Sequence, residues 1–446
     1  MRYRLLVLPV LLCALSHGSA AAQPASTTET FSLPNGLTVV LRRLPGAPAA
    51  AAAVVYRIGA DHDPEGACGL ASLIEGLYLT AATPTQACRS CDVVDARPPE
   101  GAPSAARFEH ATADDHTCFA RVLPNPELAL ELEDVAQRMG VLRVADEDVA
   151  GARERLLERI RRAYEGIPEA ASRLRARERL VEAPHGGRRL GRLADVRALT
   201  AAQVRDRLSH LYKARNAVLA VAGDFDVAAI RALVRKRFVE VPPGDEVPAP
   251  GERVPAPTGS EWDGVGDGPA IFPVAEASKA VPGSATLAVL APRQGAAKGY
   301  AAFLLVVTRL LDAASDGGGS ASAAQPSYDP DGDPAVLYLT LPLPDGASAA
   351  QAVGWLRATL VEIARAPVGP RDAVRARARL PSLFGASFPA DAPALDLYAI
   401  VRGDARRAFT GLDLDALFHL VADARTDDLR LSIGRPQRSA AAIPKR

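Results

Sequence analysis

The chain has 446 residues, of which 48% are hydrophobic, so it can bury the cores of two domains of ordinary size. Its 52 lysines and arginines equal its 52 aspartates and glutamates, and this balance gives no basis for binding nucleic acid or a membrane surface. We therefore expect a two-domain protein with no nucleic-acid partner and no stable membrane insertion.

The first 22 residues have the pattern of a secretory signal peptide. The short basic start MRYR is followed by the apolar run LLVLPVLLCALS and by the small-residue stretch SAAAQPA. The apolar run is too short to anchor the chain stably in a bilayer. We expect cleavage after Ala22 and export of the mature protein to the periplasm or the extracellular space.

Four cysteines follow this leader, namely Cys68, Cys88, Cys91 and Cys118. In an oxidising compartment an even number of cysteines favours two disulfides, and the sequence does not give their pairing. The C-x-x-C spacing of Cys88 and Cys91 also suits a metal knuckle, but the second half of a zinc ribbon is missing. Two disulfides are the preferred interpretation.

Strand and turn signals open the first half of the chain. The stretch TFSLPNGLTVVLRRLP carries Asn35 and Gly36, a pair typical of a hairpin turn, and AAAAAVVYRIG is a further strand. A helix over residues 69–79 follows. Residues 80–107 are rich in Pro, Ala, Gly and Cys and indicate a loop or insertion, after which ARFEHATADDHTCFARVL is predicted as a strand.

Helix signals dominate the rest of this half. Asn125 is the predicted N-cap of one helix, with Pro126 at its first position, and a highly charged helix begins at Asp146. Thr200 and Gln203 form a capping box for another. The strand NAVLAVAGDFD and the helix VAAIRALVRKRF complete the half.

A Pro- and Gly-rich segment, residues 241–265, is predicted as an interdomain linker. Beyond it come the strand SATLAVLAP, the helix GYAAFLLVVTRLLDAA, a Gly- and Ser-rich loop, the strand AVLYLTLPLP and the helix SAAQAVGWLRATLVEIAR. We predict an α+β fold with two related domains, residues 26–240 and 266–437. Each domain is expected to have an antiparallel or mixed sheet with helices packed on one face.

Three stretches of the first half occur in an order that is typical of one peptidase family. FSLPNGLTVVLRRLP…GLASLIEG resembles its opening hairpin and metal-binding helix, and ATADDHTCFARVLPNPELALELEDVAQRM resembles its Thr-x-x-Asp-x-Thr strand and the next helix. EAPHGGRRLGRLADVRALTAAQ…VAGDFD resembles the region from its Pro-His/Tyr-Gly element to its Gly-Asp turn. The chain thus resembles the pitrilysin–insulinase family of inverted zinc peptidases (inverzincins), which includes mitochondrial processing peptidase.

In that family, two histidines of His-x-x-Glu-His and a glutamate from a later helix bind zinc, and the intervening glutamate is the base. Here GLASLIEGLYL puts Ser72 and Gly76 at the two histidine positions and keeps only Glu75, at the base position. Aligning Arg153 with the family's arginine puts Arg159 at the third ligand position. The resemblance therefore implies a degenerate site with no functional catalytic residue and no zinc cofactor.

Three interpretations of this region remain open. Glu75 is either a solvated helix carboxylate or the partner of Arg159, whose guanidinium would then lie at the vacant metal position. A substitute metal site built from His62, His110 and His116 with the cysteines is the third, although surface or loop histidines are far commoner.

The resemblance also bears on substrate positioning. Tyr328 follows the Gly-rich loop, near where the family carries an aromatic residue that helps to bind substrate, but a packing role is preferred. Glu109 and His110 stand at the positions of an Asn-Ala pair that lines the family's substrate path. Peptide positioning of the usual kind is therefore not expected.

Members of this family often work as pairs in which one subunit keeps the zinc and the other lacks it and closes the chamber. The resemblance implies a catalytically inactive, exported subunit of this second kind, which pairs with an active zinc peptidase and helps to form a chamber for peptide substrates. The alternatives are a stand-alone peptide-binding or scaffold protein, and an active metallopeptidase with a relocated metal site.

Overall fold

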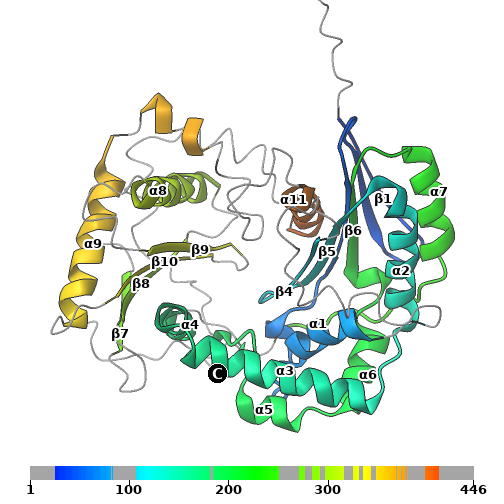
Figure 1. Ribbon diagram of the computed structural model, residues 1–446, viewed down its shortest axis with the longest axis horizontal. Helices are drawn as coiled ribbons and strands as arrows, with labels where there is room; N and C mark the ends of the chain where they lie inside the picture. Colours follow the sequence, from blue (N-terminus) through cyan, green and yellow to red (C-terminus); the bar gives the residue numbers. More distant parts are fainter. Residues whose placement is uncertain are drawn as a thin grey trace, which may run out of the picture.

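The computed structural model shows two halves side by side, each built on one β-sheet (Figure 1). The predicted signal peptide and the cysteines Cys88 and Cys91 lie outside the residues that it describes. The described residues are 26–81, 83, 107–180, 184–250, 271–276, 284–291, 297–315, 325–330, 335–342, 348–367, 369–379 with gaps, and 397–410.

The first half contains a six-stranded mixed sheet. In spatial order its strands are β1 (Thr27–Ser32), β2 (Thr38–Arg43), β6 (Ala217–Gly223), β3 (Ala50–Tyr56), β5 (Thr117–Leu123) and β4 (Arg107–Thr112). Only the pair β2–β6 is parallel. Gly36 has a φ of 89°, in the left-handed region that glycine tolerates, and it turns the predicted β1–β2 hairpin.

One strand prediction was wrong. The stretch predicted as a single strand before Pro124 is a hairpin, β4 and β5, because the chain turns at Asp114 and Asp115. The amide of Ala113 donates to the carbonyl of His116 at 2.8 Å and closes this turn. β4 is consequently the outermost strand of its sheet.

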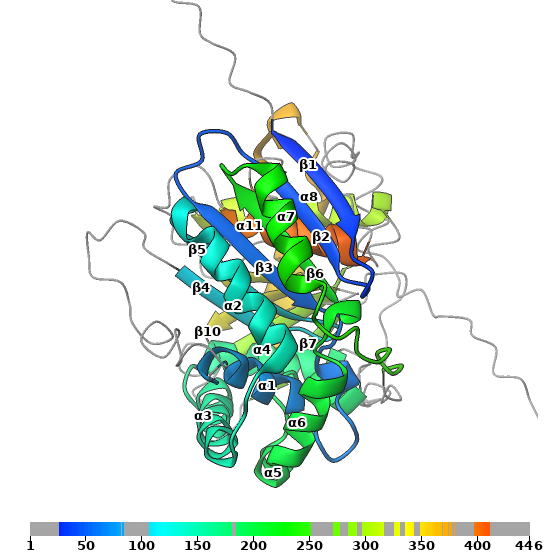
Figure 2. The same ribbon diagram turned by 90° about the vertical axis from the view of Figure 1, so that its right-hand side faces the viewer.

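Among the residues of the first half that the structure describes, seven helices follow in chain order. They are α1 (Leu70–Thr80), α2 (Leu128–Val141), α3 (Asp146–Glu165), α4 (Pro168–Leu180), α5 (Leu193–Ala198), α6 (Ala201–His210) and α7 (Val227–Phe238). Short 3₁₀ turns η1 (Ala60–His62), η2 (Asn125–Glu127) and η3 (Pro184–Gly187) precede helices, and η4 (Ala214–Asn216) precedes β6. The capping box at Thr200 forms as predicted. Figure 2 shows α2 and α7 crossing one face of the sheet, where they enclose the main apolar core.

The second half contains a four-stranded antiparallel sheet. Its strands, in spatial order, are β7 (Ile271–Glu276), β8 (Ser284–Leu290), β10 (Val336–Pro342) and β9 (Gln325–Asp329). The helices α8 (Ala297–Ser315) and α9 (Ala349–Arg365) pack on it, and α11 (Leu397–Thr410) follows later in the chain. The sequence interpretation missed β7, α4, α5 and α11.

The two halves share one supersecondary unit. In the first half β3, α1, β4, β5 and α2 follow one another, and β8, α8, β9, β10 and α9 repeat this order in the second. The strands are arranged alike in space, as β3-β5-β4 and β8-β10-β9, with antiparallel neighbours in both. The prediction of two related α+β domains is confirmed.

Each half lends one helix to the second face of the other half's sheet. Helix α4 lies on the sheet of the second half, where Ala176 packs with Val336 and Tyr338. Conversely, α11 lies on the sheet of the first half, where Leu397 and Val401 join the apolar cluster of β2, β3, β5 and β6. Both sheets are therefore covered on both faces, and the halves are interlocked (Figure 1).

The start of the predicted linker belongs to the first half. The amide of Arg215 donates to the carbonyl of Pro243 at 2.9 Å, and the amide of Asp245 donates to the carbonyl of His210 at 2.8 Å. Residues 251–265 of this linker lie outside the described residues. Among the helices that the structure describes, none is long and apolar enough to cross a membrane.

Candidate functional site

Helix α1 carries the degenerate motif, and its start is fixed by Asp63. The buried carboxylate of Asp63 accepts hydrogen bonds from the amides of Gly69 at 2.8 Å and Ala71 at 2.9 Å. Burial raises the pKa of Asp63 to about 7, although these backbone donors act in the opposite direction. His185, from the Pro-His-Gly element, donates from Nε2 to the carbonyl of Asp63 at 2.8 Å. That element therefore supports the motif helix.

Glu75 points from α1 toward β4 and is fully buried. Because side chains alternate along a strand, His110 and Thr112 share the face of β4 that meets α1. Nδ1 of His110 lies 2.6 Å from Glu75 Oε1, and the hydroxyl of Thr112 donates to Oε2 at 2.5 Å. An ionised carboxylate only accepts hydrogen bonds, so Nδ1 of His110 carries the hydrogen.

Arg159 reaches the same carboxylate from α3. Its Nη1 donates to Glu75 Oε1 at 3.0 Å, so the predicted pairing of these residues is confirmed. Burial acts to raise the pKa of Glu75, but the hydrogen bond from His110 and the charge of Arg159 outweigh it and bring the pKa to about 2. Glu75 is therefore an ionised carboxylate with both oxygens engaged, and the interpretation as a solvated helix carboxylate is wrong.

The other two former ligand positions offer no metal donor. The hydroxyl of buried Ser72 donates to the carbonyl of Arg189 at 2.7 Å. Gly76 has no side chain, and a Cβ added there would meet nothing within 4 Å. With a cationic guanidinium at Arg159 and one carboxylate already engaged, these residues do not fit a zinc ion.

The neighbouring acid on α3 does not replace the lost ligand. Glu158 pairs with Arg162 at 2.9 Å on the surface, as expected for a residue that points about 100° away from Arg159 around the helix. Arg153 donates to the carbonyl of Leu199 at 3.0 Å and so ties α3 to the end of α5.

The three candidate histidines have separate hydrogen-bond partners. His62 accepts from the amide of Gly59 at 3.2 Å, and His116 lies 2.7 Å from a carboxylate oxygen of Asp115. His110 is engaged with Glu75. Among the residues that the structure describes, no group of three or more His, Cys, Asp or Glu could hold a metal ion.

The disulfide prediction is not met at Cys68. This buried residue is a free thiol whose Sγ lies 3.7 Å from the carbonyl of Arg188, and burial raises the pKa of the thiol to about 12. Cys118 lies elsewhere, on the face of the sheet that α11 covers. Two disulfides among the four cysteines are therefore not formed here, and any bond between Cys88 and Cys91 stays a prediction.

Arg189, whose carbonyl holds Ser72, also belongs to a buried ion network between the halves. Its guanidinium binds Asp114 in the β4–β5 turn, at 2.8 and 3.1 Å, and Asp329 at the end of β9, at 2.8 Å. Arg177 of α4, 4% exposed, binds the same two aspartates. Burial acts to raise the pKa of Asp114, but the two arginines hold it well below its usual range.

Tyr328 packs against helix α8 and is partly buried. Its hydroxyl lies 2.6 Å from that of Tyr300 on α8, and its ring lies against Phe303. This contact joins the first helix of the second half to the outermost strand β9. The preferred packing role of Tyr328 agrees with this geometry.

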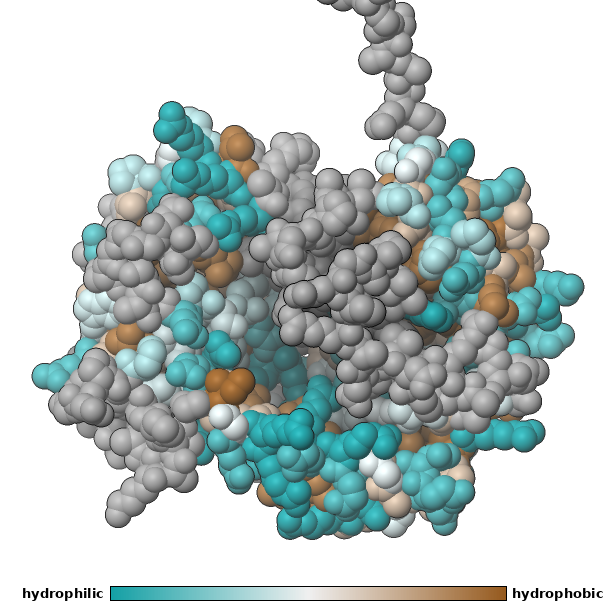
Figure 3. All heavy atoms as spheres, in the orientation of Figure 1, coloured by the Kyte–Doolittle hydropathy of each residue, from teal (hydrophilic) through white to brown (hydrophobic). Residues whose placement is uncertain are grey.

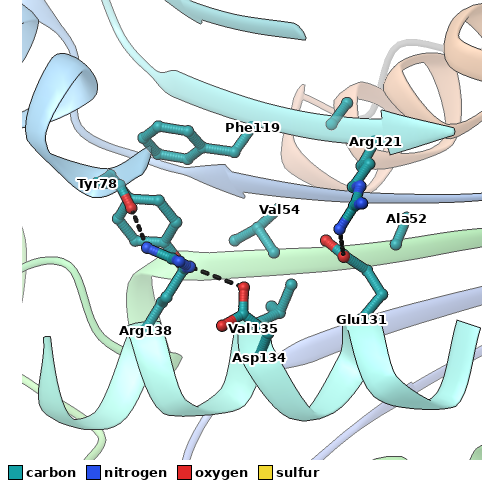
Figure 4. A pocket seen from close by; sticks show the side chains of 10 residues that line it. Ala52, Val54, Tyr78, Phe119, Arg121, Glu131, Asp134, Val135 and Arg138 are labelled. Atoms are coloured by element: carbon teal, nitrogen blue, oxygen red, sulfur yellow. Dashed lines mark hydrogen bonds and ion pairs between the residues drawn. The ribbon is translucent and has the colours of Figure 1, made fainter. Parts of the chain in front are cut away.

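A second polar cluster lines a cavity between α2 and the strands β3 and β5 (Figure 4). Arg138 donates to Asp134 at 2.8 Å and to the carbonyl of Tyr78 at 2.6 Å, and Arg121 donates to Glu131 at 2.6 Å. These pairs tie α2 to the end of α1 and to β5. The two arginines compensate the charges of the two carboxylates, so these pairs do not make the cavity predominantly positive or negative.

The surface is hollowed between the two halves in Figure 3, and hydrophilic side chains gather below the hollow, over α3 and α4. Residues 153–162 of α3 alone include five arginines. The side chains that surround Glu75 come from three elements, α1, β4 and α3, which lie near one another in Figure 1.

The sequence interpretation identified Ser72, Glu75, Gly76 and Arg159 but missed the partners that complete the site. The sequence interpretation of His110 as a metal ligand, a surface residue or part of the substrate path did not include a hydrogen bond to Glu75, because the β4–β5 hairpin was predicted as one strand. The alternation of His110 and Thr112 was the available signal. Contacts through Arg189 depend on the packing of distant segments and had no local signal.

Comparisons with known proteins agree with this architecture. A model of the family "Peptidase M16 inactive domain" matches residues 198–380, beyond the motif helix. An uncharacterized zinc protease of Mycobacterium tuberculosis is 29% identical over 220 residues, 49% of this chain and 48% of the relative, and one of Mycobacterium leprae is 28% identical over 218 residues, 49% of this chain and 47% of the relative. The chain thus matches about half the length of these curated relatives.

Solved structures resemble nearly the whole chain. A protease from Helicobacter pylori superposes with a TM-score of 0.69 at 18% identity, covering 91% of this chain and 96% of its own. A peptidase M16 inactive domain from Pseudomonas fluorescens gives 0.66 at 15%, covering 91% and 94%. Pitrilysin gives 0.61 at 16%, covering 92% of this chain and 44% of its own, so the fold is that of two-domain M16-like proteins.

Proposed function

We propose that this chain, which resembles the M16 peptidase family in sequence and in fold, is a catalytically inactive, exported subunit that pairs with an active zinc peptidase and helps to form its peptide-binding chamber. The observation that carries this proposal is the engagement of Glu75. The carboxylate at the base position has its oxygens bound by His110, Thr112 and Arg159.

The chemistry of the site supports an inactive role. A general base in such a peptidase must accept a proton from a metal-bound water, whose pKa the metal lowers. A guanidinium at the metal position binds anions by hydrogen bonds but has no open coordination site for a water. With its pKa at about 2, Glu75 is also a weak base at neutral pH.

The arrangement of the halves supports a role in holding peptides. The two interlocked halves border a hollow, and β4, the outermost strand of its sheet, is drawn beside it (Figures 1 and 3). An outermost strand can accept an extended peptide by backbone hydrogen bonds. An inactive subunit of this shape would contribute one wall of a chamber and leave the chemistry to its partner.

Export and pairing have separate support. The leader pattern of residues 1–22 favours export. Among the proteins with a similar fold, one is the first half of a periplasmic protease of Escherichia coli, and another is a chain of Complex III2 from Candida albicans. Export of this chain and its pairing with another protein are both proposals.

The test is purification of the tagged protein from its native host, followed by identification of bound proteins, metal analysis and a peptidase assay. We expect a co-purifying homologue with intact His-x-x-Glu-His, zinc at one equivalent per complex, and no peptidase activity in this chain alone. The variant Glu75→Gln in this chain should leave the activity of the complex within about twofold, because Glu75 takes no part in proton transfer. Loss of activity in this variant, with assembly intact, would contradict an inactive role.

The two alternatives give different results in the same experiment. A stand-alone peptide-binding or scaffold protein would purify without a peptidase. An active enzyme with a relocated metal site would hold near-stoichiometric zinc and cleave peptides alone, and replacing His110 or His116 would remove the metal.

A further inference from the structure

Arg159 is the one member of the degenerate site that is both charged and substantially exposed. Its side chain is 48% exposed, whereas that of Glu75 is completely covered. Nη1 is bound to Glu75 Oε1 at 3.0 Å, and no described residue accepts a hydrogen bond from Nε or Nη2. The guanidinium is therefore held in place by one nitrogen, and its other two nitrogen donors have no hydrogen-bond partner among the described residues of this half-exposed site.

These two donors have a specific complementarity. Nε and Nη2 form the side edge of the guanidinium, and this edge matches the two oxygens of a carboxylate in a bidentate pair. The pair with Glu75 already restricts the long side chain, so less conformational entropy is lost when a ligand binds. The ammonium group of a lysine is a point charge without a planar edge, so it would not favour a bidentate carboxylate in the same way.

The electrostatics favour an anionic ligand group at this place. The carboxylate of Glu75 is buried and accepts hydrogen bonds from Arg159, His110 and Thr112. Its negative charge is therefore compensated locally and repels an anionic ligand that approaches from the hollow only weakly. His110 and Arg159 contact the same oxygen of Glu75, which puts Arg159 beside β4. In the described part of the chain β4 pairs only with β5.

We propose that the outward edge of the Arg159 guanidinium binds a carboxylate of a peptide in the chamber. This inference rests on the proposed peptide-holding function and specifies the chemical group that is recognised. Two sources supply this group, the chain-terminal carboxylate of a peptide and the side chain of Asp or Glu. A guanidinium that binds carboxylate would thus stand at the position where the family resemblance places a metal ligand.

The experiment uses the full mature chain, immobilised, and three pools of random decapeptides. The first pool has free C-termini and no Asp or Glu, the second is identical but amidated, and the third is amidated with one internal Asp or Glu. Retention is quantified by mass spectrometry at about 0.05 M and 0.5 M salt. We expect the first or the third pool to be retained about tenfold more than the second at low salt, and the better of the two identifies the source of the carboxylate.

Three variants separate recognition from folding. Arg159→Gln should abolish the preference and leave retention of the amidated pool unchanged. Arg159→Lys keeps a cation near Glu75 but lacks the planar edge, so the preference should fall to about twofold to threefold. The control Arg162→Gln, which removes a 78% exposed charge from the same helix, should leave the preference intact. Thermal unfolding checks that each variant is folded.

The outcomes distinguish this inference from the proposed function. Equal retention of all three pools by the wild-type protein would overturn carboxylate recognition and leave peptide holding in place. A preference that persists in folded Arg159→Gln, or in Arg159→Lys at full strength if the first variant does not fold, would assign recognition to other residues and overturn the inference. Absence of retention in every pool would contradict both the inference and the peptide-holding function.

Discussion

Ser72 donates its hydroxyl hydrogen bond to the carbonyl oxygen of Arg189, at 2.7 Å, and the guanidinium of the same Arg189 binds Asp114 and Asp329. The first former ligand position is thus coupled through one residue to the network that joins the two halves. Asp114 lies in the turn that follows β4 in one sheet, and Asp329 is the last residue of β9, the counterpart of β4 in the other. The region around the lost metal position has become part of the contact between the halves.

The buried Arg177 is expected to be essential for this contact. Arg177→Met would remove one of the two arginines that bind Asp114 and Asp329 and should lower the free energy of unfolding by about 3–5 kcal/mol, the usual result of removing one partner from a buried ion pair. Urea denaturation measures this change, and an increase in radius of gyration by small-angle scattering would report separation of the halves.

Arg162→Met, at an exposed pair on α3, is the control for Arg177→Met and should change stability by less than about 1 kcal/mol. Equal effects of the two variants would mean that the buried network adds nothing to the contact between the halves.

Arg159→Leu tests the pair with Glu75. The carboxylate is buried, but the arginine is half exposed and His110 and Thr112 remain bound to the carboxylate. The loss of stability should therefore be about 1–2 kcal/mol, between the values typical of exposed and of buried pairs. Thermal and urea unfolding measure it. A loss below about 0.5 kcal/mol would indicate that Arg159 contributes only to recognition.

The sequence allowed the central pair to be predicted because helical spacing is a local property. Ser72, Glu75 and Gly76 lie within two turns of one helix, and the register of α3 relative to Arg153 gave Arg159. His110 depended on strand register, which was unknown once the β4–β5 hairpin had been read as one strand.

Contacts across the whole fold had no comparable signal. Arg177 is one of four arginines in α4, and nothing in their spacing distinguishes the one that meets Asp329, 152 residues away. The packing of α4 and α11 on the sheets of the opposite halves could not be predicted for the same reason, since an apolar helix face does not specify which sheet it will cover.

The pH dependence of stability gives a separate test of Glu75. Its pKa falls from an ordinary value of 4.5 to about 2, so the folded protein binds this proton less tightly than the unfolded chain does. The resulting stabilisation is fully present above pH 4.5 and is lost as the pH falls toward 2. Glu75→Gln should be less stable than the wild type at pH 7, and the difference in unfolding free energy should shrink between pH 4.5 and 2.

Urea denaturation at several pH values measures this difference, with Glu158→Gln, at an exposed carboxylate on α3, as the control. A difference between Glu75→Gln and the wild type that stays constant from pH 7 to pH 2 would show that the carboxylate is not held in its charged form by its three partners.

Gly76 provides the last test, because it stands where the second metal ligand would project. It lies in the interior of α1, and a Cβ added there would meet nothing within 4 Å. Glycine in a helix is less favourable than alanine by about 0.5–1 kcal/mol, so Gly76→Ala should stabilise the protein by about that amount. The matched control is Gly191→Ala: this glycine has a φ of 93°, and its Cβ would lie 2.4 Å from the carbonyl oxygen of Cys68, so the change should destabilise the protein. Thermal unfolding of both variants decides the matter, since destabilisation by Gly76→Ala would mean that the space of the second ligand has been closed by its surroundings.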